Sequence, residues 1–461
     1  MKNNLVDDFI KKAEGNSKTA FIYKKGRRSI KVSFDEFLND VFLMNEFLHK
    51  NTSGQNILIF SYPYSYLFFV SIFSCCFLGK NIVIIDSFGD RKKTKAMMAQ
   101  AELSDILTDN FTALLGLLLP GKIKKLNVKN FKDKRKHPGL AEQDFSVSGK
   151  NNPSILENPF TTGKNLTKPQ TASITTFTSG TTGIPKKITR DLSFLENQID
   201  LILNNAKFSE DDLVYGLLPV YTLLAVFMNH TCLVSPRIDD CNRFNVTMLL
   251  VPIKKVQKIK KPLHTVERAF LGGAILYKNE TDDILKKLPV SKITYVYGAS
   301  EGAVIYKTEL HRYKKNLFTF DEKSSGINVE IQNPDKNGTG EIVISGKTVI
   351  GENNRHNTGD YGRLENGKLI ILGRKKYSRG EISFYNYEYD ELLRKNNPAL
   401  KAAFSFYLNG KIHVAYTGRL KKESGIIYHH FSRLPYDQKH QTKLDYAKVI
   451  KNLSASSHPG F

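Results

Sequence analysis

The densest group of hydroxyl-bearing residues in this chain lies in one short segment. Residues 175–187 read TTFTSGTTGIPKK and follow a strand-like run. Glycines let a backbone approach an anion and aim its N–H groups at it, while hydroxyls and a lysine add further donors. The segment therefore suits a polyphosphate, although a flexible linker has the same composition. It is not a Walker loop, because the pattern GxxxxGK followed by Ser or Thr is absent.

The order of these residues resembles the signature of the adenylate-forming superfamily, which includes acyl-CoA synthetases, aryl-CoA ligases, luciferases and peptide-synthetase adenylation domains. The family pattern is T-S-G-(S/T)-T-G-x-P-K, and residues 178–186 match it at every fixed position. The resemblance implies a catalytic role for Thr178 and a loop that holds the phosphates of ATP. The nucleotide-binding residues that it implies are Ser179, Gly180, Thr181, Thr182, Gly183 and Lys186.

A second segment, Tyr297-Gly298-Ala299-Ser300-Glu301, resembles the family motif Y-G-x-(S/T)-E. By this resemblance Tyr297 and Gly298 belong to the nucleotide site, with the tyrosine near the adenine. Ser300 would contact a phosphate, and Glu301 would hold Mg²⁺ and take part in catalysis. Mg²⁺ prefers oxygen ligands and usually takes one or two carboxylates together with substrate phosphates. A lone glutamate without such a motif is more often a solvated surface charge.

Three shorter matches follow in the family's order. Gly272, Gly273 and Ala274 resemble a G-G-A turn whose backbone lies near the adenine and the acid. Asp360, in Thr-Gly-Asp, would accept hydrogen bonds from both ribose hydroxyls, which suits an ionised carboxylate because it only accepts. Arg374, in Gly-Arg-Lys-Lys, would contact ribose or phosphate. Each match is weak alone, since turns commonly contain glycine.

The C-terminal segment contains the lysine that the resemblance makes catalytic. Residues 434–446 read LPYDQKHQTKLDY, which is closer to the family variant P-x-D-x-R-H-x-x-K than to P-x-T-x-x-G-K. Lys443 occupies the catalytic position of this motif. The alternative is an ordinary surface lysine, since the chain is rich in lysine. The resemblance also predicts an N-terminal AMP-binding domain of residues 1–374. Residues 375–461 would then form a small lid domain that swings about Lys376.

The resemblance implies an enzyme that uses ATP and Mg²⁺ to convert a small carboxylic acid to its acyl-AMP with release of pyrophosphate. A thiol from CoA or phosphopantetheine would then accept the acyl group. One alternative is an adenylating enzyme that loads a carrier protein or another non-CoA acceptor. Others are a nucleotide-binding protein without catalysis and a basic nucleic-acid binder. No convincing match to the aspartate that holds the amine in amino-acid-activating relatives is present, which favours an aryl or fatty acid.

Strands and helices must bring these distant motifs together, and strand-like and helix-like patterns alternate along the sequence. Strand-like runs recur at residues 173–177, 213–219, 246–253 and 293–297. The expected fold is α/β. A large N-terminal domain would contain two α/β subdomains and a small β-barrel-like subdomain, with a meander or barrel at residues 326–373. A small, mobile α+β C-terminal domain would follow.

Local signals mark several of these elements. Ser33 and Glu36 have the spacing of a capping box before an amphipathic helix. Asn409-Gly410 between two apolar runs predicts a hairpin. Residues 57–79 carry no charge and are long enough to span a bilayer. Residues 61–64 divide them, so we expect a buried strand, a buried helix and a further strand, and no transmembrane segment.

The net charge and the cysteine content limit which binding partners and which cellular compartment are expected. The net charge is +23, which attracts polyanions over a long range. An acidic acyl carrier protein is a candidate partner. No nucleic acid is expected, because the basic residues are dispersed and no nucleic-acid-binding module is evident. The four cysteines form no CxxC pair, and the N-terminus does not read as a signal peptide, so the cytoplasm is the expected location.

Overall fold

The structure is a computed structural model that describes the chain with gaps. It describes residues 5–52, 54–60, 64–85, 91–108, 124–127, 172–178, 185–217, 219–290, 292–435 and 448–450. The chain divides into two compact units. Unit 1 contains Met1–Leu195 and Val234–Pro236, and unit 2 contains Glu196–Leu233 and Arg237–Phe461. The boundary expected between residues 374 and 375 is a further division that stays a prediction.

Unit 1 is built on a sheet of six strands in the order β6-β5-β3-β4-β7-β8. Neighbouring strands are parallel, except that β7 and β8 pair antiparallel. β1 and β2 form an antiparallel hairpin. The helices are α1 (Leu5–Ala13), α2 (Phe34–Asn51), α3 (Tyr66–Phe77) and α4 (Arg91–Gln100). The strands are β1 (Thr19–Lys25), β2 (Arg28–Ser33), β3 (Asn56–Phe60), β4 (Asn81–Val83), β5 (Asp105–Thr108), β6 (Lys124–Asn127), β7 (Ser173–Thr178) and β8 (Lys186–Asp191).

The capping box predicted at the start of α2 is confirmed. The Ser33 hydroxyl accepts a hydrogen bond from the N–H of Glu36 at 3.1 Å, and the Glu36 carboxylate accepts one from the N–H of Ser33 at 2.8 Å. These two bonds satisfy donors that the first turn of a helix otherwise leaves unpaired. The apolar face of α2 is completely buried: Phe37, Val41, Met44 and Leu48.

The charge-free segment contains a strand and a helix, and a further strand follows it, as predicted. β3 and β4 are parallel neighbours, and α3 lies between them in the sequence. Every residue of α3 is buried, which explains why this helix is apolar on all sides. Among the helices of the described ranges, none has both the length and the apolar character needed to cross a bilayer.

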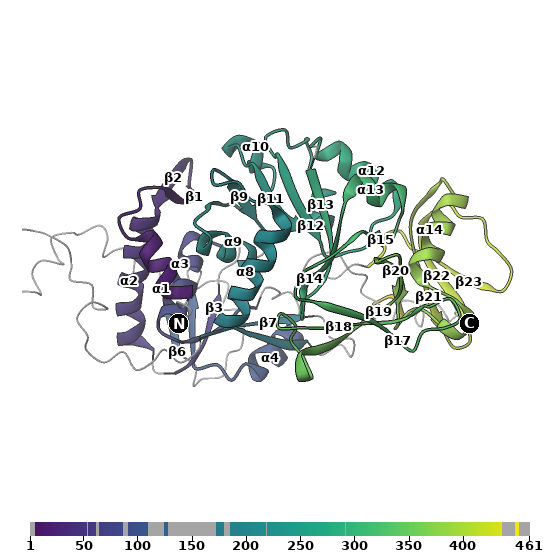
Figure 1. The fold of residues 1–461 in the computed structure, drawn as a ribbon, viewed down its shortest axis with the longest axis horizontal. Coiled ribbons are helices and arrows are strands. Elements are labelled where there is room, and N and C mark those ends of the chain that lie inside the picture. The colour runs from purple at the N-terminus through teal and green to yellow at the C-terminus, as the bar shows by residue number, and fades with distance from the viewer. Residues whose placement is uncertain are drawn as a thin grey trace, which may run out of the picture. The chain divides into compact units, whose positions relative to one another are not determined.

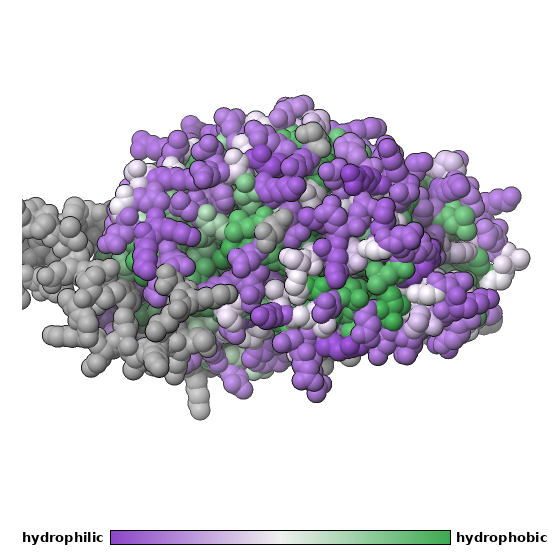
Figure 2. All heavy atoms as spheres, viewed as in Figure 1, coloured by the Kyte–Doolittle hydropathy of each residue, from purple (hydrophilic) through white to green (hydrophobic). Residues whose placement is uncertain are grey.

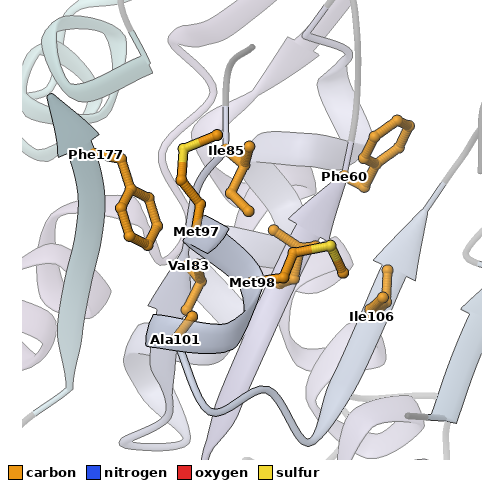
Figure 3. Packing of buried hydrophobic residues seen from close by; sticks show 9 residues of the cluster. Phe60, Val83, Ile85, Met97, Met98, Ala101, Ile106 and Phe177 are labelled. Carbon is orange, nitrogen blue, oxygen red and sulfur yellow. The ribbon is translucent and has the colours of Figure 1, made fainter. Parts of the chain in front are cut away.

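The strand that leads into the hydroxyl-rich loop is anchored in the core of unit 1. Phe177, in β7, is 3% exposed and belongs to a cluster with side chains from β3, β4, β5 and α4. In Figure 3 its ring points toward Met97 and Val83. Burying an aromatic side chain of this size is worth about 2–3 kcal/mol. The cluster therefore fixes the backbone next to Thr178.

Unit 2 contains a mixed sheet in which its strands run in the order β16-β14-β13-β12-β11-β9-β10. The neighbouring strands β13, β12, β11, β9 and β10 are parallel. β14 pairs antiparallel with β13, and β16 pairs antiparallel with β14. The first strands are β9 (Leu213–Gly216), β10 (Thr231–Val234), β11 (Met248–Pro252), β12 (Arg268–Gly272), β13 (Lys292–Ala299), β14 (Ala303–Glu309) and β16 (Glu322–Lys323). The helices are α8 (Leu192–Ala206), which begins in unit 1, α9 (Pro219–Phe227), α10 (Asp240–Phe244), α11 (Ile253–Val256), α12 (Lys278–Lys287) and α13 (Leu310–Lys315).

The strand predicted at residues 213–219 was wrong at its end. β9 stops at Gly216, and Pro219 is the first residue of α9. Proline fits the first helical position, because its missing N–H has no partner there in any case and its φ angle suits a helix. The helix therefore begins where the apolar pattern alone suggested a continuing strand.

Residues 319–374 contribute a five-stranded antiparallel sheet in the order β15-β20-β19-β18-β17. β15 and β17 are the edge strands of this sheet. The described strand pairs therefore form an open meander, and they do not include the pairing of edge strands that would close the expected barrel. The strands are β15 (Thr319–Phe320), β17 (Asn328–Gln332), β18 (Gly340–Ser345), β19 (Arg355–Glu365) and β20 (Lys368–Arg374), with a short helix η1 (Glu352–Asn354).

The last part of unit 2 is the predicted α+β segment. Asn409 and Gly410 have φ angles of 49° and 79° and connect an antiparallel hairpin, as the Asn-Gly signal predicted. A third strand pairs parallel with the second strand of this hairpin, and α14 packs on its first strand (Figure 1). The elements are η2 (Gly380–Ile382), α14 (Asn386–Asn396), β21 (Leu400–Leu408), β22 (Lys411–Gly418) and β23 (Ile426–His430).

Parallel strands that alternate with helices in both units confirm the predicted α/β class. β6 lies in residues 121–172, and the rest of that segment falls mostly outside the described ranges. On the face drawn in Figure 2, hydrophilic side chains cover most of the described surface rather than one stripe. This agrees with charged residues that are dispersed along the sequence.

Candidate active site

The hydroxyl-rich loop connects a β-hairpin in unit 1. β7 and β8 pair antiparallel, and Thr178 and Lys186 are Cα partners at the end of the ladder. The hydroxyls of Thr175 and Thr189 hydrogen-bond across the same two strands at 2.8 Å. The described ends of this segment are therefore paired with each other in unit 1. Five of its predicted nucleotide-binding residues fall outside the described ranges: Ser179, Gly180, Thr181, Thr182 and Gly183.

Two further motifs meet at one edge of the sheet in unit 2. β11, β12 and β13 are parallel neighbours, so their carboxyl ends lie at the same edge. Gly272, at the end of β12, is the Cα partner of Val296 in β13. The turns that follow these strands carry residues 273–274 and 300–301. In open α/β sheets, ligands bind in the crevice beyond the carboxyl ends of the strands.

Both glycines of the Gly-Gly-Ala turn have a structural reason. A Cβ at Gly272 would lie 2.5 Å from the Cγ2 atom of Val296, so β13 comes this close only because the side chain is missing. Gly273 has a φ of +92°, which L side chains rarely adopt. The hydroxyl of Tyr295 donates to the backbone oxygen of Ala274 at 2.5 Å. The turn is therefore held in one conformation at the edge of the sheet.

Asp360 lies at the centre of a polar cluster in unit 2. The hydroxyl of Tyr297 donates to its Oδ2 atom at 2.8 Å, and Nε of Arg374 lies 3.1 Å from its Oδ1 atom. Asp360 and Arg374 are also Cα partners across β19 and β20. Nη1 of Arg374 donates to the backbone oxygen of Thr358 at 2.8 Å, which fixes the guanidinium. The structure thus brings together three of the predicted nucleotide-binding residues.

Charge and burial set the protonation states in this cluster. The negative charge of Asp360 raises the pKa of Arg374, which stays a cation. Burial, followed by the charge of Asp360, raises the pKa of Tyr297 well above its usual value, so its hydroxyl remains a donor. The Asp360 side chain is 9% exposed, and its Oδ1 atom accepts no hydrogen bond from the described residues. This oxygen is buried and lies against the guanidinium of Arg374.

Glu301 lies in the turn after β13. Its Oε2 atom is 3.6 Å from Nε2 of His356, and its backbone oxygen accepts the N–H of Ile350 at 2.6 Å. His356 belongs to β19, the strand that also carries Asp360. The contact therefore connects the Tyr297–Glu301 segment to the Asp360 strand. His356 belongs to none of the sequence motifs, and its position four residues before Asp360 is the one sequence feature that points to it.

A divalent cation at Glu301 would depend on oxygen ligands from a bound nucleotide. Within the described ranges, no three or more His, Cys, Asp or Glu side chains are arranged to hold a metal ion together. One carboxylate completed by phosphate oxygens is a common arrangement for Mg²⁺, so Glu301 fits the predicted metal.

The remaining predicted residues are distributed as follows. Gly298 lies at the irregular end of β13, where the register with β14 shifts after Tyr297, and Ser300 is in the turn that follows the strand. Lys186 is exposed and belongs to unit 1. Lys443 falls outside the described residues.

Unit 2 contains a second buried carboxylate, Asp390 in α14. Its Oδ2 atom accepts a hydrogen bond from the hydroxyl of Tyr277 at 2.9 Å, and its Oδ1 atom accepts one from the N–H of Ser405 at 2.7 Å. The guanidinium carbon of Arg394 lies 3.6 Å from the centre of the Tyr277 ring. Burial raises the pKa of Asp390 to about 7.

We expect Asp390→Asn to change how stability depends on pH. The folded state keeps the Asp390 proton up to its pKa of about 7. The unfolded state loses the proton near pH 4. The contribution of Asp390 to the wild-type free energy of unfolding should therefore fall as pH rises from about 4 to about 7, by up to about 1.4 kcal/mol per pH unit, and should stay level above that range. The asparagine variant lacks this loss. Urea unfolding between pH 4 and 8 measures the difference.

Asp335→Asn is the control for this experiment. The N–H of Thr339 donates to Asp335 and lowers its pKa, so its contribution to stability is lost only as pH falls through the acidic range. The difference between the Asp335 variant and wild type should therefore be constant from pH 5 to 8. Parallel pH profiles for the Asp390 variant and wild type would contradict the prediction.

The sequence profile of one protein family, described as AMP-binding enzyme, matches residues 10–351 of the 461 residues. The chain belongs to the AMP-binding enzyme family. This confirms the predicted family. The matched range of this AMP-binding enzyme includes the hydroxyl-rich loop, the Gly-Gly-Ala turn and Glu301, while Asp360, Arg374 and Lys443 lie beyond it.

Curated relatives are similar over part of their length. The chain is 24% identical over 253 residues to 4-coumarate–CoA ligase CCL1 from Humulus lupulus, which covers 43% of this chain and 46% of that protein. It is 27% identical over 268 residues to 2-succinylbenzoate–CoA ligase from Staphylococcus aureus, which covers 49% of this chain and 52% of that protein. The chain thus spans about half the length of the curated relatives it matches.

Solved structures share the fold over almost the whole chain. The o-succinylbenzoate CoA synthetase MenE from Bacillus subtilis, in complex with an acyl-adenylate intermediate, has a TM-score of 0.72 at 17% identity and covers 97% of this chain and 98% of its own. ATP-bound MatB from Rhodopseudomonas palustris has a TM-score of 0.75 at 14% identity, covering 99% and 100%. The amide bond synthetase McbA from Marinactinospora thermotolerans has a TM-score of 0.74 at 13% identity, covering 97% and 99%. At these identities the likeness concerns the fold alone.

Proposed function

We propose that this protein activates a carboxylic acid with ATP, forming an acyl-AMP and releasing pyrophosphate. The cluster of Tyr297, Asp360 and Arg374 supports this proposal most directly. A carboxylate only accepts hydrogen bonds, which suits the two hydroxyls of a ribose, and the adjacent guanidinium suits a ribose or phosphate oxygen. The family and the fold point in the same direction, because MenE has been solved with an acyl-adenylate.

In the proposed reaction, a carboxylate oxygen attacks the α-phosphorus of ATP. The bond from this phosphorus to the bridging oxygen breaks, and the electron pair leaves with pyrophosphate. Both reactants are anions, so positioning and fixed positive charge supply most of the rate enhancement. Residues 178–186 would hold the β- and γ-phosphates, Asp360 and Arg374 would fix the ribose, and Lys443 would bridge the carboxylate and the α-phosphate.

Mg²⁺ at Glu301 would neutralise phosphate charge. We therefore expect Glu301→Gln to raise the Mg²⁺ concentration for half-maximal activity about tenfold, since one ligand charge is lost. The measurement is a Mg²⁺ titration of acid-dependent ATP–pyrophosphate exchange at saturating ATP. Glu352→Gln removes the same charge from an exposed site in η1 and should leave the titration unchanged. Equal titrations for Glu301→Gln and wild type would remove Glu301 from the metal site.

The proposed second step transfers the acyl group to a thiol, either of CoA or of a phosphopantetheine arm on an acidic carrier protein. The names of the curated relatives, 4-coumarate–CoA ligase and 2-succinylbenzoate–CoA ligase, support CoA and an aryl acid. An amine is a second candidate acceptor, because the fold is equally similar to an amide bond synthetase. The carbonyl carbon of the acyl-AMP would be attacked in each case, and AMP would leave.

The deciding experiment is ATP–pyrophosphate exchange with a panel of aryl, fatty and amino acids, with hydroxylamine to trap the acyl-AMP. We expect exchange with one class of acid. ATP binding without exchange for any acid in the panel would favour a nucleotide-binding protein without catalysis. Mass spectrometry of the products with CoA, a phosphopantetheinylated carrier or an amine then separates the acceptors.

A further inference from the structure

Arg374 is held by a residue of α14 that none of the family motifs includes. Asn386, the first residue of this helix, is completely buried. Its Oδ1 atom accepts the backbone N–H of Arg374 at 2.8 Å and the hydroxyl of Ser378 at 3.1 Å. Its Nδ2 atom has no hydrogen-bond partner among the described residues. The acceptor oxygen therefore accounts for the side-chain hydrogen bonds of this asparagine.

The chain just before Arg374 packs directly on Asn386. A Cβ at Gly373 would lie 2.9 Å from both the backbone nitrogen and Oδ1 of Asn386. Contacts of this length do not occur in real structures, so the absence of a side chain at Gly373 is required. The backbone of Asn386 is fixed as well, because its N–H donates to the hydroxyl of Ser378 at 3.1 Å and its oxygen accepts the hydroxyl of Ser405 at 3.2 Å. The end of β20 and the start of α14 are thus joined directly by hydrogen bonds and close packing, and this contact is called the joint below.

This joint leads to the proposed nucleotide site through one residue. The backbone of Arg374 is bonded to Asn386, while its guanidinium contacts Asp360 and the backbone oxygen of Thr358. The backbone position determines where the guanidinium can reach. A shift at the N–H of Arg374 would therefore move the charge next to Asp360.

α14 makes a second contact with the rest of unit 2 one helical turn after Asn386, through Asp390. The hydroxyl of Tyr277 donates to Asp390, and Arg394 covers the ring of Tyr277. Tyr277 follows the Gly-Gly-Ala turn by three residues. α14 therefore contacts both the strand end that carries Arg374 and the segment that leaves the turn at residues 272–274.

We propose that Asn386 is a positioning residue for nucleotide binding, which acts through the backbone of Arg374 and makes ATP affinity depend on the docking of α14. The inference rests on the proposed function, because it takes Arg374 and Asp360 as nucleotide contacts. Asn386 does not touch the nucleotide itself. Its contribution is to hold the guanidinium beside Asp360 before ATP arrives, so that binding does not have to order it.

The test compares Mg-ATP affinity, measured by calorimetry on the full chain, for wild type and three variants. Asn386→Ala leaves the N–H of Arg374 without its partner, and we expect the Kd to rise about tenfold. Asn386→Asp keeps the acceptor oxygen, so its Kd should stay within about threefold of wild type. Gly373→Ala forces a Cβ into the joint, and its Kd should rise as in Asn386→Ala. This last variant keeps the proposal testable if Asn386→Ala does not fold.

Asn397→Ala is the matched control at the other end of α14. Nδ2 of Asn397 donates to the backbone oxygen of Leu393 at 2.9 Å, and its Oδ1 atom accepts the N–H of Lys421 at 2.8 Å. Its loss weakens the helix end without affecting the joint at Arg374. We expect a lower melting temperature and an unchanged Kd for ATP.

Steady-state kinetics distinguish a positioning role from a general effect on folding, because only a positioning role raises the KM for ATP while leaving kcat unchanged. In ATP–pyrophosphate exchange, the KM for ATP of Asn386→Ala should rise about tenfold, while kcat at saturating ATP stays within about twofold. A wild-type Kd in Asn386→Ala, or an equal rise in Asn397→Ala, would overturn the inference and leave the proposed function intact. Wild-type protein that binds ATP without exchange would overturn the proposed function, while the Kd comparison would still decide the role of Asn386.

Discussion

Replacing Asp360 with asparagine will lower kcat/KM for ATP about 10- to 100-fold, because hydrogen bonds to a charged group are worth about 1.5–3 kcal/mol. The variant keeps the size of the side chain but loses the negative charge beside Arg374. It also turns one of two acceptor oxygens into a donor, so a ribose diol can no longer be accepted on both sides. ATP–pyrophosphate exchange as a function of ATP concentration measures the effect.

Asp321→Asn is a matched control for the Asp360 variant. Asp321 also accepts a hydroxyl hydrogen bond, from Thr308 at 2.6 Å, and also forms an ion pair, with Lys368 at 3.1 Å. The two carboxylates thus have the same kinds of partner. We expect Asp321→Asn to leave the KM for ATP unchanged. Equal losses in the two variants would indicate a general effect on folding rather than a nucleotide site at Asp360.

The second large effect is expected at Lys443. Lys443→Ala should lower the rate of acid-dependent pyrophosphate release by about 10²–10³, which is typical for the loss of one group that stabilises charge in a transition state. ATP affinity should change much less, because the lysine is proposed to act on the reacting carboxylate and α-phosphate. Single-turnover release of pyrophosphate at saturating ATP separates the two effects.

Lys448→Ala, five residues later in the same lysine-rich tail, serves as its control and should retain the wild-type rate. Near-normal pyrophosphate release in Lys443→Ala would show that the motif match had selected the wrong lysine. A loss in both variants would indicate an effect of tail charge rather than a specific role for Lys443.

Signals carried by neighbouring residues were predictable from the sequence. The capping pair of Ser33 and Glu36 and the hairpin turn at Asn409-Gly410 depend on bonds within a few residues, and both are confirmed. The buried helix α3 was predictable because a proline interrupts the charge-free run. A buried strand followed by a buried helix fits such a run better than a membrane span does. The family could be recognised from residues 178–186, because the order of the residues in that loop is more specific than their composition.

Contacts between distant segments were not predictable in this way. His356 lies against Glu301, and Asn386 holds Arg374, through pairings that no local pattern encodes. The end of β9 was wrong because an apolar run does not distinguish a strand from the start of a helix, and Pro219 decides it. The roles of Asp360 and Lys443 came from the resemblance, since neither lies in a motif that is specific alone.

The strand order in unit 1 has a consequence for how the chain must fold. β4 pairs with β3 on one side and with β7 on the other, yet β7 begins 90 residues after β4 ends. At a synthesis rate of about 5–20 residues per second, one side of β4 waits roughly 5–20 seconds for its partner. During that interval the emerging polypeptide exposes an unpaired strand edge close to the uniformly apolar α3, and such surfaces invite aggregation. We therefore expect chaperones to bind the newly made chain before the hydroxyl-rich segment has been translated.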